Sequence, residues 1–281
     1  MNHCMLLETR HTDLSPESLV QQAGQVFTVF GSDTQDSGNV SYGVRAGDQR
    51  FFLKTAGAAD AQAPLDRPDR IALLRNAIAL HRSVTHEVLP ALRNVIETPD
   101  GPVLVFDWVD GELLRVEEAQ RSDPASPHVR FRRLPVANIL SALDQILELH
   151  NRLASAGWIA VDFYDGALIY DFAANALHVF DLDHYQRGPF INRMGRMFGS
   201  SRFMAPEEFQ LGAQIDERST VFTMGRTIVE LLSDSGVTST MRGPAAVAEV
   251  AGRACQPDPR DRFGSLRELC RAWAEARSAA V

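Results

Sequence analysis

Two aspartates stand in apolar stretches that have the pattern of β-strands, VDFYDGALIYD at residues 161–171 and VFDLDHY at residues 179–185. Asp162 and Asp181 lie 19 residues apart, and the sequence between them predicts a β-hairpin. A carboxylate at the end of a buried strand costs free energy unless it is paired with a cation or bound to a metal. The two aspartates therefore constrain both the fold and the chemistry of the chain. Each aspartate taken alone also fits a simple turn, the first of them close to Gly166.

The composition indicates a globular protein, because 45% of the 281 residues are apolar and this is enough for a continuous core. The formal net charge is -8, and no basic run is long enough to follow a nucleic-acid backbone, so no nucleic-acid partner is predicted. The cysteines, Cys4, Cys255 and Cys270, are far apart, which argues against a disulfide framework or a zinc site. Without a leader pattern or an apolar run of about 18 residues, we expect a cytoplasmic protein with no membrane partner.

The strand and helix patterns change along the chain. Residues 26–54 predict antiparallel strands joined by polar turns, and residues 95–109 predict a further strand pair. One helix is predicted between them, over about residues 69–84. Residues 116–134 are polar and rich in arginine and predict an inserted loop. From Val136 onward the apolar spacing predicts a mainly helical chain with a few short strands.

We therefore expect an α+β, two-lobed fold with a small β-rich N-terminal lobe and a larger, mainly helical C-terminal lobe. The predicted boundaries are an N-terminal extension at residues 1–25, the small lobe at 26–109, the large lobe at 110–275 and a tail at 276–281. In two-lobed proteins, ligands commonly bind where the lobes meet, so the site is expected there.

Seven stretches occur in an order and at spacings that fit one family. They are RFFLK (50–54), LVFDWVDGELL (104–114), AGWIAVDFYDGALIYD (156–171), VFDLD (179–183), SSRFMAPEEF (200–209), TVFTMGRTIVELL (220–232) and DPRDRF (258–263). From about Val26 to Trp273 the chain resembles the eukaryotic-type Ser/Thr protein kinases as they occur in bacteria, and the fold expected from the patterns is the kinase fold.

The resemblance implies an ATP site in the N-terminal lobe. A lysine on the third strand would hold the α- and β-phosphates, a loop with two glycines would cover them, and backbone groups of the connecting strand would bind adenine. The loop sequence, GSDTQDSGNV, lacks closely spaced glycines, and an ordinary hairpin turn fits it equally well. Lys54 is the lysine assigned to the phosphates. Gly31, Gly38 and Val40 belong to the covering loop, and the backbone from Asp107 to Val109 is assigned to adenine.

The resemblance also implies the reaction site. Asp162 would be the catalytic carboxylate that accepts the proton of the attacking hydroxyl, and Asp181 would hold Mg²⁺ or Mn²⁺ on the phosphates of ATP. Glu207 and Arg262 would form a structural ion pair that anchors the platform for a protein substrate.

Several positions of the reaction site depart from the family pattern. Ala160 and Val161 stand where the family has His-Arg, and Ala167 stands where it has the asparagine that holds a second metal ion. Asp165 and Asp183 are candidate replacements for that ligand, because Mg²⁺ prefers hard oxygen donors.

Three further departures affect the supports of the site. No Asp or Glu lies between Arg70 and His86, where the family has the acid that pairs with the lysine. Phe52 stands where a small alanine usually covers adenine, and Thr220 stands where a buried aspartate usually supports the catalytic loop.

Charged and titratable residues between the metal-binding aspartate and the platform admit two interpretations. His184 is expected to be structural. The arginines of this segment favour acidic substrates, although a solvated surface is the more common explanation for such a group. They are Arg187, Arg193, Arg196 and Arg202.

Three functions are consistent with these residues. The first is an atypical protein Ser/Thr kinase that transfers the γ-phosphate of Mg-ATP to a hydroxyl of an unidentified protein substrate. The second is a pseudokinase that keeps the fold as a nucleotide-binding or scaffolding module. The third, a small-molecule kinase of related fold, is disfavoured by Ala205-Pro206-Glu207 and the arginine that pairs with it, since such kinases lack this closing segment.

Overall fold

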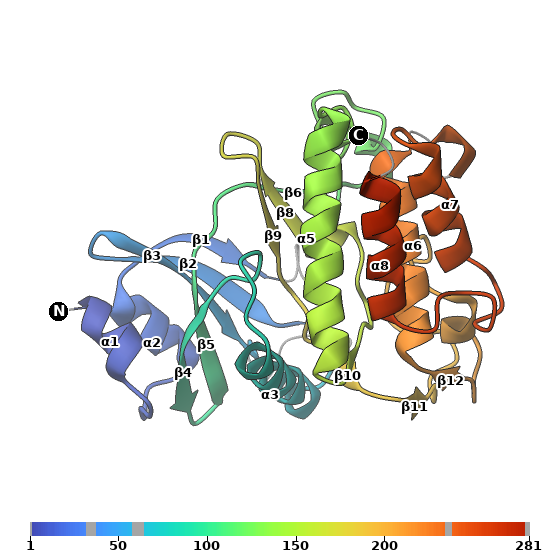
Figure 1. Cartoon of the computed structure of the whole chain (residues 1–281). Helices are drawn as coiled ribbons and strands as arrows, with labels where there is room; N and C mark the ends of the chain where they lie inside the picture. Colours follow the sequence, from blue (N-terminus) through green and yellow to red (C-terminus); the bar gives the residue numbers. More distant parts are fainter. Residues whose placement is uncertain (1, 32–37, 58–64, 234–237, 279–281) are drawn as a thin grey trace. The chain divides into compact units, whose positions relative to one another are not determined.

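The computed structural model describes residues 2–31, 38–57, 65–233 and 238–278 (Figure 1). The chain forms two compact units, Met1–Val109 and Asp110–Val281. Helices and β-sheets occur in both units, so the predicted α+β class is confirmed. The sequence places a boundary between lobes at the same residues, and the assignment of the units as kinase lobes stays a prediction.

An antiparallel sheet of five strands forms the centre of the first unit. The strands hydrogen-bond in the order β1-β2-β3-β5-β4. Their bounds are β1 Gln25–Phe30, β2 Val40–Ala46, β3 Gln49–Thr55, β4 Leu92–Thr98 and β5 Gly101–Asp107. The register places Lys54 between Ser41 of β2 and Leu104 of β5. Because side chains alternate along a strand, Leu53 and Lys54 point to opposite faces of the sheet.

The N-terminal residues belong to the core of the first unit. Helices α1 (Asn2–Glu8) and α2 (Pro16–Ala23) pack on one face of the sheet (Figure 1). Leu6 and Leu19 are fully buried in a cluster that includes Leu53 of β3. The expected extension at residues 1–25 is therefore not separate from the sheet. Two-turn helices present too few apolar positions for a clear helical period, which explains why the sequence did not reveal them.

Helix α3 (Arg67–Ser83) covers the opposite face of the sheet. It begins after Asp66, whose side chain accepts a hydrogen bond from the amide of Asp69 and so caps the first turn. Its buried side chains, among them Leu74 and Ile78, pack with Leu104 of β5. The helix predicted over residues 69–84 is thus confirmed to within two residues.

The second unit is mainly helical. Its longer helices, α5 (Val136–Ser155), α6 (Glu217–Leu232), α7 (Ala245–Ala254) and α8 (Leu266–Ser278), lie side by side (Figure 1). Most side chains of α6 are buried, so its polar residues require partners inside the protein. None of the described helices has the length and apolar composition that crossing a membrane requires.

Short elements connect these helices. Helix α4 (Pro127–Arg132) lies in the stretch 116–134, where the sequence predicts only a loop, because six residues are too short for a periodic signal. The predicted hairpin is present as β8 (Leu168–Asp171) and β9 (Ala176–Val179). The other short strands are β6 (Glu112–Leu113), which pairs with β8, β7 (Trp158–Ile159) with β10 (Gln186–Arg187), and β11 (Phe190–Ile191) with β12 (Gln214–Ile215). The 3₁₀ turns are η1 (Glu118–Gln120), η2 (Asp165–Ala167), η3 (Pro206–Phe209) and η4 (Thr238–Thr240).

Replacement of Leu19 by alanine tests whether α2 is part of the core. The variant is expected to lose about 2–5 kcal/mol of unfolding free energy, because a fully buried leucine leaves a cavity when truncated. Urea unfolding measures the loss. Val29→Ala is the control, since Val29 lies in β1 of the sheet on which α2 packs and is 54% exposed. Its unfolding free energy is expected to change by less than about 0.5 kcal/mol. A Leu19→Ala variant as stable as this control would show that α2 is dispensable.

Candidate active site

Both candidate carboxylates have a left-handed backbone conformation. The angle φ is 63° at Asp162 and 59° at Asp181, and the one other described non-glycine residue with positive φ is Asn175, at 51°, in the β8–β9 turn. Such a conformation costs roughly 1–3 kcal/mol, persists only where the surroundings enforce it, and is concentrated at functional sites. The two aspartates that the sequence singles out are therefore also strained points of the backbone.

A hydroxyl of α6 supports the loop that carries Asp162. The amide of Ala160, two residues earlier, donates a hydrogen bond of 3.0 Å to Thr220 Oγ1. Thr220 is buried, so this contact is shielded from water. A hydroxyl accepts an amide hydrogen bond as a carboxylate does, but no charge has to be buried. Thr220 thus supports the loop from the position at which the resemblance implies an aspartate.

A backbone hydrogen bond joins the two segments that carry the aspartates. The amide of Phe180, which precedes Asp181, donates to the carbonyl of Ala167 at 3.1 Å. Ala167 follows Asp162 by five residues, and its buried methyl group offers no oxygen to a metal. Asp181 is exposed. The contact fixes the end of β9 to the turn after the candidate catalytic residue.

His184 lies beside Asp162. Its Nε2 atom is 3.9 Å from Asp162 Oδ2, and the two side chains are 17% and 25% exposed. The imidazole also packs against Phe198, with 4.7 Å between ring centroids. The sequence predicts only a structural role for His184, whereas the structure brings it next to the candidate catalytic carboxylate.

Asp165 belongs to a buried cluster of charges. Arg202 Nη2 donates to both of its oxygens, at 2.9 and 2.7 Å, and Arg202 Nη1 donates to Glu230 at 2.9 Å. Arg226 Nη2 donates to the other oxygen of Glu230 at 2.6 Å, and His128 Nδ1 lies 3.8 Å from Asp165. Two carboxylates thus balance two guanidinium groups, as burial requires. Only the i,i+4 pair Arg226–Glu230 is visible in the sequence.

The metal-binding role of Asp181 stays a prediction. Within the described residues, no group of three or more His, Cys, Asp or Glu side chains could hold a metal ion. Mg²⁺ commonly uses one or two carboxylates together with substrate phosphates, so an exposed aspartate fits this role without a protein cage. Asp165 already binds Arg202 with both oxygens, and Asp183 is buried. The roles of these two residues as second ligands stay predictions.

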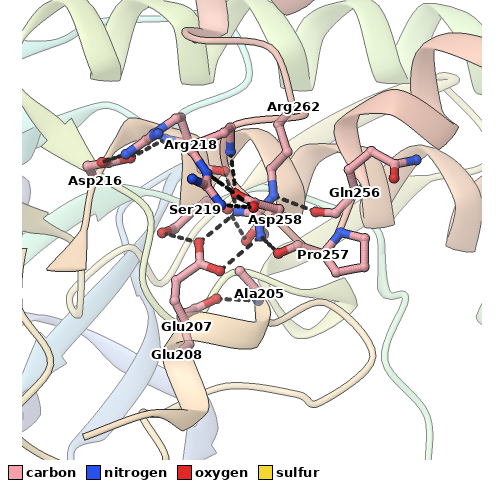
Figure 2. Close-up of polar contacts among 12 residues, drawn as sticks. Ala205, Glu207, Glu208, Asp216, Arg218, Ser219, Gln256, Pro257, Asp258 and Arg262 are labelled. Atoms are coloured by element: carbon pink, nitrogen blue, oxygen red, sulfur yellow. Dashed lines mark hydrogen bonds and ion pairs between the residues drawn. The ribbon is translucent and has the colours of Figure 1, made fainter. Parts of the chain in front are cut away.

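The expected ion pair between Glu207 and Arg262 is present (Figure 2). Arg262 Nη1 and Nη2 donate to the two carboxylate oxygens at 2.7 and 2.9 Å, and Ser219 Oγ of α6 donates to Glu207 at 2.7 Å. The guanidinium group also donates to the backbone carbonyls of Arg218, Gln256 and Pro257. The pair therefore fastens the turn η3 to α6 and to the loop before α8.

The two adjacent glutamates of η3 differ in protonation. Burial alone would raise the pKa of Glu207, but the hydrogen bonds from Arg262 and Ser219 outweigh it and hold this pKa below the usual value. Burial raises the pKa of Glu208 to about 8, although its Oε2 accepts a hydrogen bond of 2.6 Å from the amide of Ala205. Glu207 is thus the charged partner of Arg262, while Glu208 favours the neutral form.

In the first unit, Lys54 is buried on the face of the sheet that α3 covers. Burial and the nearby Lys54 ammonium lower the pKa of His81 on α3 to about 4, so the imidazole is neutral at pH 7. A group of α3 that interacts with Lys54 is thus the neutral imidazole of His81. No Asp or Glu lies between Arg70 and His86 to take the place of the acid that the family pairs with the lysine.

The ends of the predicted phosphate-covering loop are described, and its middle, residues 32–37, lies outside the described residues. Gly31 follows β1, and Gly38, with φ of 84°, precedes β2. Arg70 Nη1 donates to the carbonyls of Gly38 and Ala56, each at 2.7 Å, and Thr55 Oγ1 donates to the carbonyl of Val40 at 2.9 Å. A buried arginine that the sequence did not single out therefore holds one end of this loop.

The predicted adenine-binding strand is β5 and the residues after it. The carboxylate of Asp107 accepts two hydrogen bonds from Arg93 Nε, at 2.8 and 2.9 Å. The amides of Asp107 and Trp108 donate to backbone carbonyls within the unit, at 3.1 and 3.2 Å. Both amides are therefore already engaged within the unit, and adenine binding by the backbone from Asp107 to Val109 stays a prediction.

Phe52 lies in a row of aromatic side chains on the first unit. Its ring centroid is 6.0 Å from that of Phe30 and 6.4 Å from that of Phe106, and Phe30 is 6.5 Å from Trp108. Where the family pattern has a small alanine, the ring of Phe52 therefore fills the space and packs against its aromatic neighbours.

Comparison with known proteins supports a kinase-like relationship. No protein family model matches the chain. The chain is 26% identical over 206 residues to the serine/threonine-protein kinase PknG of Mycobacterium leprae (strain TN), a match that covers 66% of this chain and 25% of that kinase. The chain thus spans about a quarter of the length of the curated relative that it matches.

Substitution of Glu207 by glutamine tests the buried ion pair. At pH 7 the variant is expected to lose about 3–5 kcal/mol of unfolding free energy, because the Arg262 guanidinium stays buried without its counter-charge. In the wild type, the lowered pKa of Glu207 gives stability that is present above the unfolded-state pKa and lost as the pH falls through the folded-state value. The difference between the two proteins is therefore expected to shrink below about pH 4.

Glu208→Gln is the matched control, since it places the same substitution at the adjacent buried glutamate. The raised pKa of Glu208 gives stability that is present below its unfolded-state pKa and is lost as the pH rises toward about 8. Glutamine keeps the acceptor for the Ala205 amide, so this variant is expected to gain stability relative to the wild type as the pH rises over this range. Urea unfolding at several pH values measures both effects, and equal losses from the two substitutions would contradict the assignment.

Thr220→Val tests the support of the Asp162 loop. The variant keeps the shape of the side chain but leaves the Ala160 amide without its acceptor, at an expected cost of about 1–3 kcal/mol. Thr220→Ser retains the hydroxyl and is expected to retain the slow hydrogen exchange of the Ala160 amide, which Thr220→Val accelerates. Equal hydrogen-exchange rates of the Ala160 amide in the two variants would contradict the proposed support by Thr220.

Proposed function

We propose that the protein is an atypical protein Ser/Thr kinase that transfers the γ-phosphate of Mg-ATP to a hydroxyl of a protein substrate. The observation that carries the proposal is the left-handed backbone shared by Asp162 and Asp181. These are the two carboxylates that such a reaction needs, one near the attacking hydroxyl and one for the metal. The similarity to a Ser/Thr protein kinase supports the same class of reaction.

The proposed roles of the residues follow from their chemistry. Asp162 would orient the substrate hydroxyl and accept its proton, and Lys54 would bind the α- and β-phosphates. Asp181 would hold Mg²⁺, which when bound offsets the negative charge of the phosphates. Phosphoryl transfer is catalysed mainly by positioning and electrostatic stabilisation. The support of the Asp162 loop by Thr220 therefore contributes to the rate as well as to stability.

A protein is favoured as the acceptor over a small molecule. The closing segment Ala205-Pro206-Glu207 is anchored by the buried Arg262, and an anchored segment of this kind offers a firm platform to a polypeptide. A platform that is already ordered loses little conformational entropy of its own when a substrate segment binds.

A second candidate function is that of a nucleotide-binding or scaffolding pseudokinase. It is favoured by the engagement of Asp165 with Arg202, which withdraws one candidate for the second metal ligand, and by the buried methyl group of Ala167. The packed ring of Phe52 further narrows the space for adenine.

The test is phosphate transfer by the full chain. The protein is incubated with labelled ATP and Mg²⁺ or Mn²⁺, with either an acidic or a basic generic protein acceptor. Asp162→Asn and Asp181→Ala are each expected to reduce transfer by at least about 100-fold, the usual scale for loss of a proton-accepting or charge-stabilising group. Asp123→Asn, at an exposed turn carboxylate, serves as the control and is expected to keep full activity.

The alternative outcome is equally defined. If the wild-type protein transfers no phosphate but its melting temperature rises when ATP is added, the pseudokinase assignment replaces the kinase. Transfer that survives both aspartate substitutions would show that the reaction occurs elsewhere or comes from a contaminant.

A further inference from the structure

The segment from β10 to β12 carries a concentration of exposed apolar side chains. Eight large apolar residues are exposed among the described residues, and five of them lie in this segment. They are Ile191 (51%), Met194 (52%), Phe198 (37%), Phe209 (41%) and Leu211 (74%). We call these five side chains, together with Arg187, Arg193 and Arg196, the docking surface. Exposed apolar groups gathered in this way mark interaction sites more often than scattered ones do.

The backbone beneath the docking surface is held in one conformation by Asn192. Asn192 is almost fully buried, and its side-chain oxygen accepts hydrogen bonds from the amides of Met194 and Gly195, at 2.9 and 3.2 Å. Its Nδ2 donates to the carbonyl of Gly195 at 2.6 Å and to that of Glu208 at 3.2 Å. The turn that carries Met194 is thus tied to η3, and a preordered surface loses little entropy on binding.

Backbone pairing brings the two halves of the docking surface together. The amide of Asn192 donates to the carbonyl of Ala213, and the amide of Gly212 donates to the carbonyl of Asn192, both at 2.8 Å. Leu211 is therefore close to the β11 end of the surface. The guanidinium group of Arg196 lies over the ring of Phe209, 5.9 Å from its centroid. Apolar and basic groups are interleaved on this surface.

One end of the docking surface reaches the candidate catalytic carboxylate. Phe198 packs against His184, with 4.7 Å between centroids, and His184 Nε2 lies 3.9 Å from Asp162 Oδ2. A polypeptide whose hydroxyl lies at Asp162 would place its neighbouring residues against Phe198 and the side chains beyond it.

The exposed charges of this segment are all positive. Arg187, Arg193 and Arg196 are exposed, whereas Glu207 and Glu208 are buried. No other Asp or Glu occurs between Gln186 and Ile215. This local excess of positive charge contrasts with the formal net charge of -8 for the whole chain. Guanidinium groups bind carboxylates through paired hydrogen bonds, so the complementary ligand is acidic.

We infer that the docking surface binds an extended segment of the substrate protein in which acidic residues alternate with apolar ones, next to the acceptor Ser or Thr. This inference rests on the proposed kinase function and specifies its substrate class. The acidic side chains lie against the three arginines, chiefly Arg193, because the guanidinium groups of Arg187 and Arg196 also donate to backbone carbonyls of the chain. The apolar side chains cover the five exposed apolar groups. Anionic membranes share this chemistry, but the contact from Phe198 through His184 to Asp162 favours a polypeptide.

The test uses the full chain and two short fluorescent peptides that share one serine and the same apolar residues. One peptide carries glutamates and the other carries lysines at the remaining positions. Fluorescence polarisation without ATP is expected to show at least about tenfold tighter binding of the acidic peptide, and Arg193→Glu is expected to remove this preference. Arg267→Glu, at an exposed arginine of α8, is the matched control and is expected to bind as the wild type does. Unchanged melting temperatures establish that both variants are folded.

Phosphorylation of the same peptides separates this inference from the proposed function. Arg193→Glu is expected to raise KM for the acidic peptide by about tenfold while kcat stays the same, because the contact contributes to binding only. Preferential binding of the acidic peptide without phosphate transfer would support the docking surface and contradict the kinase. Transfer to both peptides with equal affinity and equal KM would overturn the docking surface and leave the kinase intact. Arginine-dependent binding to phosphatidylserine vesicles without any peptide preference would assign the surface to membranes and also overturn the inference.

Discussion

The buried ion pair between Glu207 and Arg262 is the contact that anchors η3 in the second unit, which carries the candidate catalytic residues. It joins η3 to α6 through Ser219, and it leaves the charged groups shielded from water. Because α6 is buried on most sides, its polar side chains need hydrogen-bond partners, and several of these partners lie in neighbouring segments. Thr220 accepts a hydrogen bond from the Ala160 amide, in the loop of the candidate catalytic residue. Glu230 accepts one from Arg202, near the end of the segment that follows Asp181. One buried helix therefore binds the loop before Asp162, the turn η3 and Arg202.

The charge cluster around Arg202 ties the segment after Asp181 to the turn that follows Asp162 and to α6. Arg202 binds Asp165 in the turn after the candidate catalytic residue and Glu230 on α6, and its own carbonyl accepts a hydrogen bond of 2.7 Å from Arg226 Nε. Removing one member would leave a buried charge without compensation, which usually costs more than the pair contributes. The same contact thus occupies both oxygens of Asp165, one of the two candidates for a second metal ligand.

The sequence predicted the elements that have long or repeated patterns, namely the strands of the first sheet, α3, α5 and the β8–β9 hairpin. It also predicted Arg262 as the partner of Glu207, because the order of the motifs resembles that of a family in which the two positions pair. It could not predict the cluster of Asp165, Arg202 and Glu230, because residues 37 and 28 positions apart are brought together only by packing. The backbone strain at Asp162 and Asp181 and the proximity of His184 were likewise inaccessible, because neither follows from residue type or spacing. The short helices α1, α2 and α4 were missed because their apolar period is too brief to detect.

The proposed phosphoryl transfer requires that a nucleotide bind at Asp162 and Asp181. The most direct measurement is a crystal structure of the full chain with Mg²⁺ and a non-hydrolysable ATP analogue at saturating concentration. We expect electron density for a metal on the Asp181 carboxylate and for a terminal phosphate that faces Asp162. A nucleotide bound with its metal away from Asp181, or crystals that contain no nucleotide at saturation, would contradict the proposal that Asp162 and Asp181 form a phosphoryl-transfer site.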